Sequence, residues 1–202
     1  VDTVTPLSPP ATPLVYGMPG LPAGIEFAPT DFVQVNGELN RLMVERALEL
    51  LEPRQDDHAL DLFCGLGNFS LPLARRVATV TGIEGDAALV ARAAANAGRN
   101  GIGNACFHVA DLAAELQAAW ADCPYDLVLL DPPRAGAREV LPAAVKSRPR
   151  RIVYVSCHAG TLARDAGILV DRHGYRLSAA GIMDMFPHTS HVESIALFEP
   201  AA

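Results

Sequence analysis

The chain has 202 residues, of which 50% are hydrophobic and 6% aromatic, and this composition suits one α/β domain with a sizeable core. Its net charge of −7 argues against wrapping nucleic acid unaided, because non-specific affinity comes mainly from neutralising phosphates. No apolar run is long enough to span a membrane and no signal peptide is evident, so we expect a cytoplasmic protein. We expect neither a disulfide framework nor a metal site, because the spacing is irregular among Cys64, Cys106, Cys123 and Cys157.

The first 30 residues differ from the rest of the chain. They contain seven prolines and little periodicity, which predicts an extended arm or the remnant of a preceding domain. A single domain is expected over residues 31–202. It begins with a helical pattern that runs up to Pro53 and consists of Leu39, Leu42, Met43, Ala47, Leu50 and Leu51.

From residue 58 onward, strand and helix patterns alternate. Strands are expected at 58–63, 78–83, 104–109, 126–130, 151–156, 175–182 and 192–198. Helices are expected at 68–76, 86–99, 112–120, 136–146 and 160–173. This alternation predicts right-handed βαβ units and a mainly parallel, Rossmann-like seven-stranded sheet with helices on both faces. The last two strands are joined by a short loop, so we expect them to form an antiparallel pair.

Three of the expected strands end on groups suited to a ligand site. One ends at Cys157, one at Asp131 with two prolines after it, and one at a turn that contains Gly65 and Gly67. The carboxyl ends of parallel strands form the ligand-binding edge of open α/β sheets, so we expect these groups to lie together. Taken alone, Cys157 also fits a packed core cysteine.

The glycine turn indicates close approach of a ligand to the backbone. The next strand ends at Glu84, about 20 residues further on, where a carboxylate accepts hydrogen bonds from ribose hydroxyls in dinucleotide folds. Asp86 fits the N-cap of the following helix. A third glycine is missing from the pyrophosphate-binding pattern, which disfavours NAD, and the loop resembles motif I of the class I methyltransferases.

Three motifs in the second half of the chain carry a more specific resemblance. They are Asp131-Pro-Pro-Arg134, Val155-Ser-Cys157 and Phe186-Pro-His-Thr-Ser-His-Val-Glu193-Ser. In this order they resemble the RNA uracil-5-methyltransferase family over residues 30–199. The segments 156–165 and 183–189 resemble most the branch that acts on 23S ribosomal RNA.

The resemblance implies an S-adenosylmethionine-dependent class I methyltransferase that makes 5-methyluridine in RNA, with ribosomal RNA preferred over transfer RNA as the partner. By resemblance, Cys157 adds to C6 of uracil, Asp131 holds the uracil edge, and Glu193 removes the C5 proton. For Glu193, an outward-facing strand residue is the alternative that the local pattern leaves open.

The resemblance also implies a set of cofactor contacts. Phe63 is expected to pack against the adenosine, although a core position is open to it as well. Asp111 stands where such folds place an acid near the adenine, and a helix N-cap is the alternative. The full set of expected cofactor-binding residues is Gln34, Phe63, Gly65, Gly67, Asn68, Glu84, Asp111 and Asp131.

The chain departs from the family pattern directly after the expected nucleophile. Relatives carry Asn or Asp and then Pro there, whereas this chain has His158-Ala159-Gly160. We expect a more mobile loop, with an imidazolium that lowers the thiol pKa or lies in solvent. Two rival hypotheses remain: an amino-group methyltransferase, which would leave Cys157 and Glu193 without a role, and a cofactor- or RNA-binding module without turnover.

Overall fold

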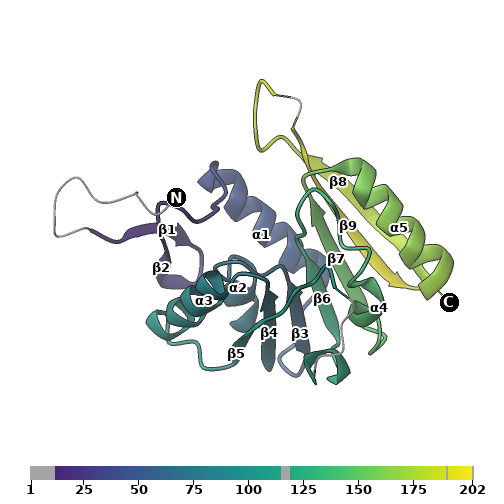
Figure 1. Ribbon diagram of the computed structural model, residues 1–202, viewed down its shortest axis with the longest axis horizontal. Helices are drawn as coiled ribbons and strands as arrows, with labels where there is room; N and C mark the ends of the chain where they lie inside the picture. Colours follow the sequence, from purple (N-terminus) through teal and green to yellow (C-terminus); the bar gives the residue numbers. More distant parts are fainter. Residues whose placement is uncertain (1–11, 115–118, 190, 202) are drawn as a thin grey trace.

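The computed structural model describes residues 12–114, 119–189 and 191–201, and a seven-stranded sheet lies at its centre (Figure 1). Its strand order is β5-β4-β3-β6-β7-β9-β8. Neighbouring strands from β5 to β7 are parallel, whereas β9 is antiparallel to both β7 and β8. This confirms the mainly parallel sheet with an antiparallel last strand. The strands are β3 (His58–Leu62), β4 (Thr79–Glu84), β5 (Ala105–Val109), β6 (Leu127–Leu130), β7 (Arg151–Ser156), β8 (Tyr175–Met183) and β9 (Glu193–Pro200).

Each face of the sheet is covered by its own apolar cluster. Successive side chains of a strand point to opposite faces, so Leu129 belongs to one cluster and Leu130 to the other. The first cluster packs α1 (Gly37–Leu51), α2 (Ser70–Ala74) and α3 (Ala87–Arg99) onto the sheet. The second packs α4 (Leu141–Ala144) and α5 (Ala159–His173). Helices therefore cover both faces, as the alternating pattern predicted.

Two helices are shorter than expected, and both contain a proline. The expected helix 136–146 is reduced to α4, because Gly136 has a φ of 85° and Pro142 lacks the N–H that a helix interior requires. The expected helix 68–76 is reduced to α2, which contains Pro72. Part of the expected helix 112–120 lies outside the described residues, and its described end is a 3₁₀ turn at Ala119–Asp122.

A β-hairpin occupies part of the region in which an extended arm was expected. It consists of β1 (Leu14–Met18) and β2 (Leu21–Phe27), and it lies beside α3 (Figure 1). Asn96 and Asn100 are buried on α3, and their carboxamides exchange hydrogen bonds with the backbone of Ala23, Gly24 and Glu26. The prediction of an arm is therefore corrected for residues 14–27, whereas residues 1–11 lie outside the described part and the domain boundary stays a prediction.

Candidate active site

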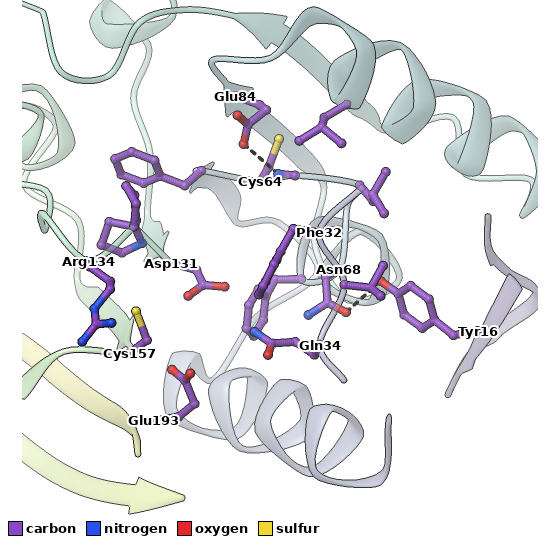
Figure 2. A pocket seen from close by; sticks show the side chains of 18 residues that line it. Tyr16, Phe32, Gln34, Cys64, Asn68, Glu84, Asp131, Arg134, Cys157 and Glu193 are labelled. Atoms are coloured by element: carbon purple, nitrogen blue, oxygen red, sulfur yellow. Dashed lines mark hydrogen bonds between the residues drawn. The ribbon is translucent and has the colours of Figure 1, made fainter. Parts of the chain in front are cut away.

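The carboxyl ends of β3, β4, β6 and β7 surround a cavity of about 480 Å³. The cavity lies where the strand order reverses, because the chain leaves β3 toward β4 on one side and returns to β6 on the other. Figure 2 shows Asp131, Cys157 and Glu193 at one end of this cavity, with Arg134 beside them. Four groups from three separate parts of the sequence thus face one cavity.

Strand register brings the expected nucleophile and base together. Cys157 directly follows β7, and Glu193 begins β9. These strands are antiparallel neighbours in which Ser156 is paired with Ser194. Cys157 and Glu193 are the direct neighbours of this pair on the side of the cavity, and both line it. The outward-facing alternative for Glu193 is excluded, because its side chain is buried.

The electrostatics of this end of the cavity favour protonated groups. Burial raises the pKa of Cys157, and the neighbouring Glu193 and Asp131 raise it further, whereas Arg134 lowers it. Burial, then Glu193 and Asp61, raise the pKa of Asp131 to about 7. Burial also raises the pKa of Glu193, which makes this carboxylate a stronger base than an exposed one.

The glycine turn after β3 is held by an acid from β4. One oxygen of Glu84 accepts a hydrogen bond from the Gly65 amide at 3.1 Å, and the other accepts from the Gly85 amide at 2.7 Å. Phe63, at the start of the turn, has a φ of 64° and lines the cavity. Gly67 has a φ of 90°, and a Cβ there would lie 2.8 Å from Leu71. The turn therefore requires glycine for both conformation and space.

Asn68 is fixed by a carboxamide network. It exchanges two hydrogen bonds with Asn40 of α1, at 2.9 and 3.0 Å, and it accepts a third from the Tyr16 hydroxyl at 3.1 Å. Gln34 also lines the cavity, and its Oε1 is buried without a hydrogen-bond partner among the described residues. An unsatisfied buried acceptor beside a cavity favours a ligand that donates a hydrogen bond to it.

His158 has a structural role that the sequence did not reveal. Its Nδ1 accepts a hydrogen bond from the Thr161 amide at 3.2 Å and so caps the N-terminus of α5. Burial and the acids beside Cys157 raise the thiol pKa, and the effect of His158 on it stays a prediction.

Asp86 and Asp111, which follow β4 and β5, each accept a hydrogen bond from a backbone amide two residues further on. Asp86 caps α3 by accepting from the Ala88 amide at 2.7 Å, as predicted. Asp111 is exposed, accepts from the Ala113 amide at 2.9 Å, and does not line the cavity. This hydrogen bond lies in a turn at residues 112–114, so both the helix N-cap and the place near an adenine stay predictions for Asp111.

Several cavity residues were not predicted from the sequence, among them two aromatic residues and a cysteine. Phe32 and Cys64 line the cavity, and so does Tyr16 from the hairpin. Pro19-Gly20 between two apolar segments is a hairpin signal that could have revealed Tyr16. Within residues 12–114, 119–189 and 191–201, no cluster of three or more His, Cys, Asp or Glu is arranged to hold a metal ion. No helix in the described part is long and apolar enough to cross a membrane.

The strand order and the cavity at the carboxyl edge define a class I methyltransferase fold. The chain belongs to the family described as tRNA (Uracil-5-)-methyltransferase, which it matches over residues 24–200. This result confirms the family resemblance seen in the three motifs.

Individual relatives agree with this placement. The chain is 57% identical over 200 residues to the 23S rRNA (uracil(1939)-C(5))-methyltransferase RlmD of Stenotrophomonas maltophilia, and 56% identical to that of Xanthomonas campestris. Each alignment covers 98% of this chain but 45% of the relative, so the chain spans less than half their length. The Pyrococcus abyssi tRNA (uracil-54, C5)-methyltransferase in complex with S-adenosyl-L-homocysteine superimposes with a TM-score of 0.72 at 33% identity, over 86% of this chain and 41% of that one.

Proposed function

We propose that this domain transfers a methyl group from S-adenosylmethionine to C5 of a uridine in RNA, with 23S ribosomal RNA as the substrate. The observation that carries the proposal is the convergence of Cys157, Asp131 and Glu193 at one end of a single cavity. The substrate is inferred from the RlmD enzymes, to which the chain is 56–57% identical. The expected cytoplasmic location is part of the proposal and stays a prediction.

The rest of the cavity fits S-adenosylmethionine. Glu84 is placed to accept from ribose hydroxyls, Phe63 offers an apolar face, and the free Oε1 of Gln34 can accept from an amino group. Asn68 is held rigidly at the same wall. A similar protein of this family was solved with the demethylated cofactor, S-adenosyl-L-homocysteine. When bound, S-adenosylmethionine supplies an electrophilic methyl group on a sulfonium centre.

The side chains have complementary tasks in the proposed reaction. The thiolate of Cys157 adds to C6 of uracil, and the electron pair of the C5–C6 double bond moves toward O4. Asp131 holds the uracil edge by accepting a hydrogen bond from the N3 proton, and so orients C6 for attack by the thiolate. The resulting enolate is nucleophilic at C5, which takes the methyl group. Glu193 then removes the C5 proton, the C5–C6 double bond forms again, and the bond from C6 to the Cys157 sulfur breaks.

The identity of these groups disfavours the amino-group methyltransferase hypothesis. A reaction at an exocyclic amine requires neither a thiol nor a general base such as a carboxylate on β9, yet Cys157 and Glu193 face the cavity together.

The target uracil must leave its stack in the RNA to reach Cys157 and Glu193. Since the chain carries a net charge of −7, we expect weak RNA affinity for this domain alone.

The proposal is tested by methyl transfer from labelled S-adenosylmethionine to transcripts of a 23S rRNA fragment and of tRNA, followed by mass spectrometry of the nucleosides. We expect 5-methyluridine in the ribosomal fragment with the unsubstituted chain and none with Cys157→Ala. Label in the tRNA alone would replace ribosomal RNA by transfer RNA as the substrate. Cofactor binding without 5-methyluridine in either RNA, even with an RNA-binding domain of a relative fused to the chain, would contradict the proposal.

A further inference from the structure

Asp165 of α5 connects the chain segments that carry the expected catalytic groups. It is fully buried. Its Oδ2 accepts hydrogen bonds from the Ala137 amide and from the Tyr154 hydroxyl, each at 2.7 Å. Its Oδ1 accepts from Arg164 Nε at 2.8 Å. One carboxylate therefore joins a loop, a strand and a helix.

Each connected segment leads directly to the cavity. Ala137 lies in the loop between Asp131 and α4, and Tyr154 lies on β7 three residues before Cys157. Asp165 itself lies on α5, which begins two residues after Cys157. We infer that Asp165 is a positioning residue that fixes the Asp131 loop relative to Cys157. The inference rests on the proposed function, because it assigns Asp165 a role in that same site.

The loop is built closely against this carboxylate. Gly136 has a φ of 85°, and a Cβ at this position would lie 2.5 Å from Arg164 Nη2 and 2.6 Å from Asp165 Oδ2. Arg164 Nη2 also donates to the Ala135 carbonyl at 2.9 Å, which makes a second connection to the loop. The backbone thus passes so near to Asp165 and Arg164 that no side chain fits between them.

The cofactor half of the cavity is held by other contacts. Glu84 anchors the glycine turn, and Asn40 and Tyr16 anchor Asn68. None of the hydrogen bonds of Asp165 extends to these groups. A change at Asp165 is therefore expected to disturb the geometry around Cys157 and Asp131 while it leaves cofactor affinity nearly unchanged. Substitution of a residue with a purely structural role would not change the geometry around Cys157 and Asp131 separately from cofactor affinity.

Asp57 provides a matched control at the opposite edge of the sheet. It is also buried, accepts from the Arg54 amide at 2.6 Å, and pairs with Arg150 at 2.5 Å. These contacts join the start of β3 to the start of β7, far along both strands from Cys157. Asp57→Asn therefore disturbs a comparable buried acid of the same sheet without touching the Asp131 loop.

The test compares Asp165→Asn and the milder Tyr154→Phe with Asp57→Asn and the unsubstituted chain. Hydrogen exchange reports on the loop around Ala137, and alkylation by iodoacetamide reports on Cys157, with the exposed Cys106 and Cys123 as internal standards. We expect Asp165→Asn to speed exchange and to change Cys157 alkylation by about fivefold or more, the effect of losing one buried hydrogen bond. Tyr154→Phe should have a smaller effect in the same direction.

A catalytic readout completes the comparison. With S-adenosylmethionine and an RNA that carries 5-fluorouridine, Asp165→Asn should slow covalent adduct formation by about tenfold, with cofactor affinity within about twofold. Asp57→Asn should lower the melting temperature and leave these readouts unchanged. Exchange and alkylation in Asp165→Asn equal to those of the unsubstituted chain, or equal effects in Asp57→Asn, would overturn the inference. Failure of the unsubstituted chain to form any adduct counts against the proposed function, whereas exchange and alkylation still decide the role of Asp165.

Discussion

Cys157 and Glu193 are 36 positions apart in the sequence, yet each is the direct neighbour of one member of the cross-strand pair Ser156–Ser194, and both line the cavity. The nucleophile and the base of the proposed reaction are thus placed by the sheet itself. The hydrogen bonds between β7 and β9 fix this register, and the register in turn sets the relative position of Cys157 and Glu193. The acid opposite the thiol also raises the pKa of Cys157.

Glu193→Gln is expected to have two effects. Loss of the negative charge lowers the pKa of Cys157, so the pH profile of Cys157 alkylation shifts to lower pH. Loss of the base slows turnover by about 100-fold or more, and an adduct with ordinary uridine accumulates because C5 keeps its proton. Glu199→Gln, at the far end of β9, is the control and should leave the alkylation profile unchanged. An unshifted profile in Glu193→Gln would contradict the assigned coupling.

Glu84→Gln is expected to weaken binding of S-adenosylmethionine by about tenfold, because a charge-assisted hydrogen bond contributes about 1.5 kcal/mol or more. Isothermal titration calorimetry measures the change. Asp86→Ala is the control, since Asp86 caps α3 and does not line the cavity. It should lower the free energy of unfolding by about 1 kcal/mol and leave cofactor affinity unchanged. Equal affinities of Glu84→Gln and the unsubstituted chain for S-adenosylmethionine would contradict a role of Glu84 in cofactor binding.

Asn40→Ala tests the network behind the cofactor wall. It deletes both hydrogen bonds between Asn40 and Asn68 in a buried position, so we expect a loss of about 1–3 kcal/mol in unfolding free energy and several-fold weaker cofactor binding. Asn36→Ala on the same helix is the control. Asn36 caps α1 through the Leu39 amide, and its loss should reduce stability alone. Unchanged cofactor affinity in Asn40→Ala would show that Asn68 needs no such support.

Asp61→Asn is expected to flatten the dependence of stability on pH. Burial raises the pKa of Asp61 from 3.8 to about 7, and Oδ1 has no hydrogen-bond partner among the described residues. Between about pH 4 and 7 the folded chain therefore binds more protons at Asp61 than the unfolded chain does. Its contribution to the free energy of unfolding falls as pH rises, by up to about 1.4 kcal/mol per pH unit. Urea unfolding at pH 5, 6 and 7 measures the slopes, and identical slopes would contradict this assignment.

Regular patterns made the sheet predictable. Strand β7 was expected at residues 151–156 and lies at Arg151–Ser156, because its β-branched residues are buried on both faces. Helix α5 was expected at 160–173 and lies at Ala159–His173, ending at Gly174 in the left-handed conformation. The convergence of Cys157 and Asp131 followed from the rule that parallel strands end at the same edge.

Contacts between distant segments were not predictable in the same way. The position of Glu193 opposite Cys157 depends on a register that no local pattern states. Tyr16 lines the cavity because Asn96 and Asn100 hold β2 against α3. The high proline content of this region had favoured an extended arm over a hairpin. His158 departs from the family residue and yet caps α5, because its Nδ1 accepts the hydrogen bond that a side-chain oxygen accepts in a usual cap.

Covalent trapping tests the central claim most directly. The unsubstituted chain and Cys157→Ala are incubated with S-adenosylmethionine and an RNA that carries 5-fluorouridine, and a denaturing gel then separates free protein from adduct. Fluorine at C5 blocks the proton removal assigned to Glu193, so the account predicts a denaturation-resistant adduct with the unsubstituted chain and none with Cys157→Ala. An adduct that persists in Cys157→Ala, or methylation of ordinary uridine without any adduct of the fluorinated base, would contradict Cys157 as the nucleophile.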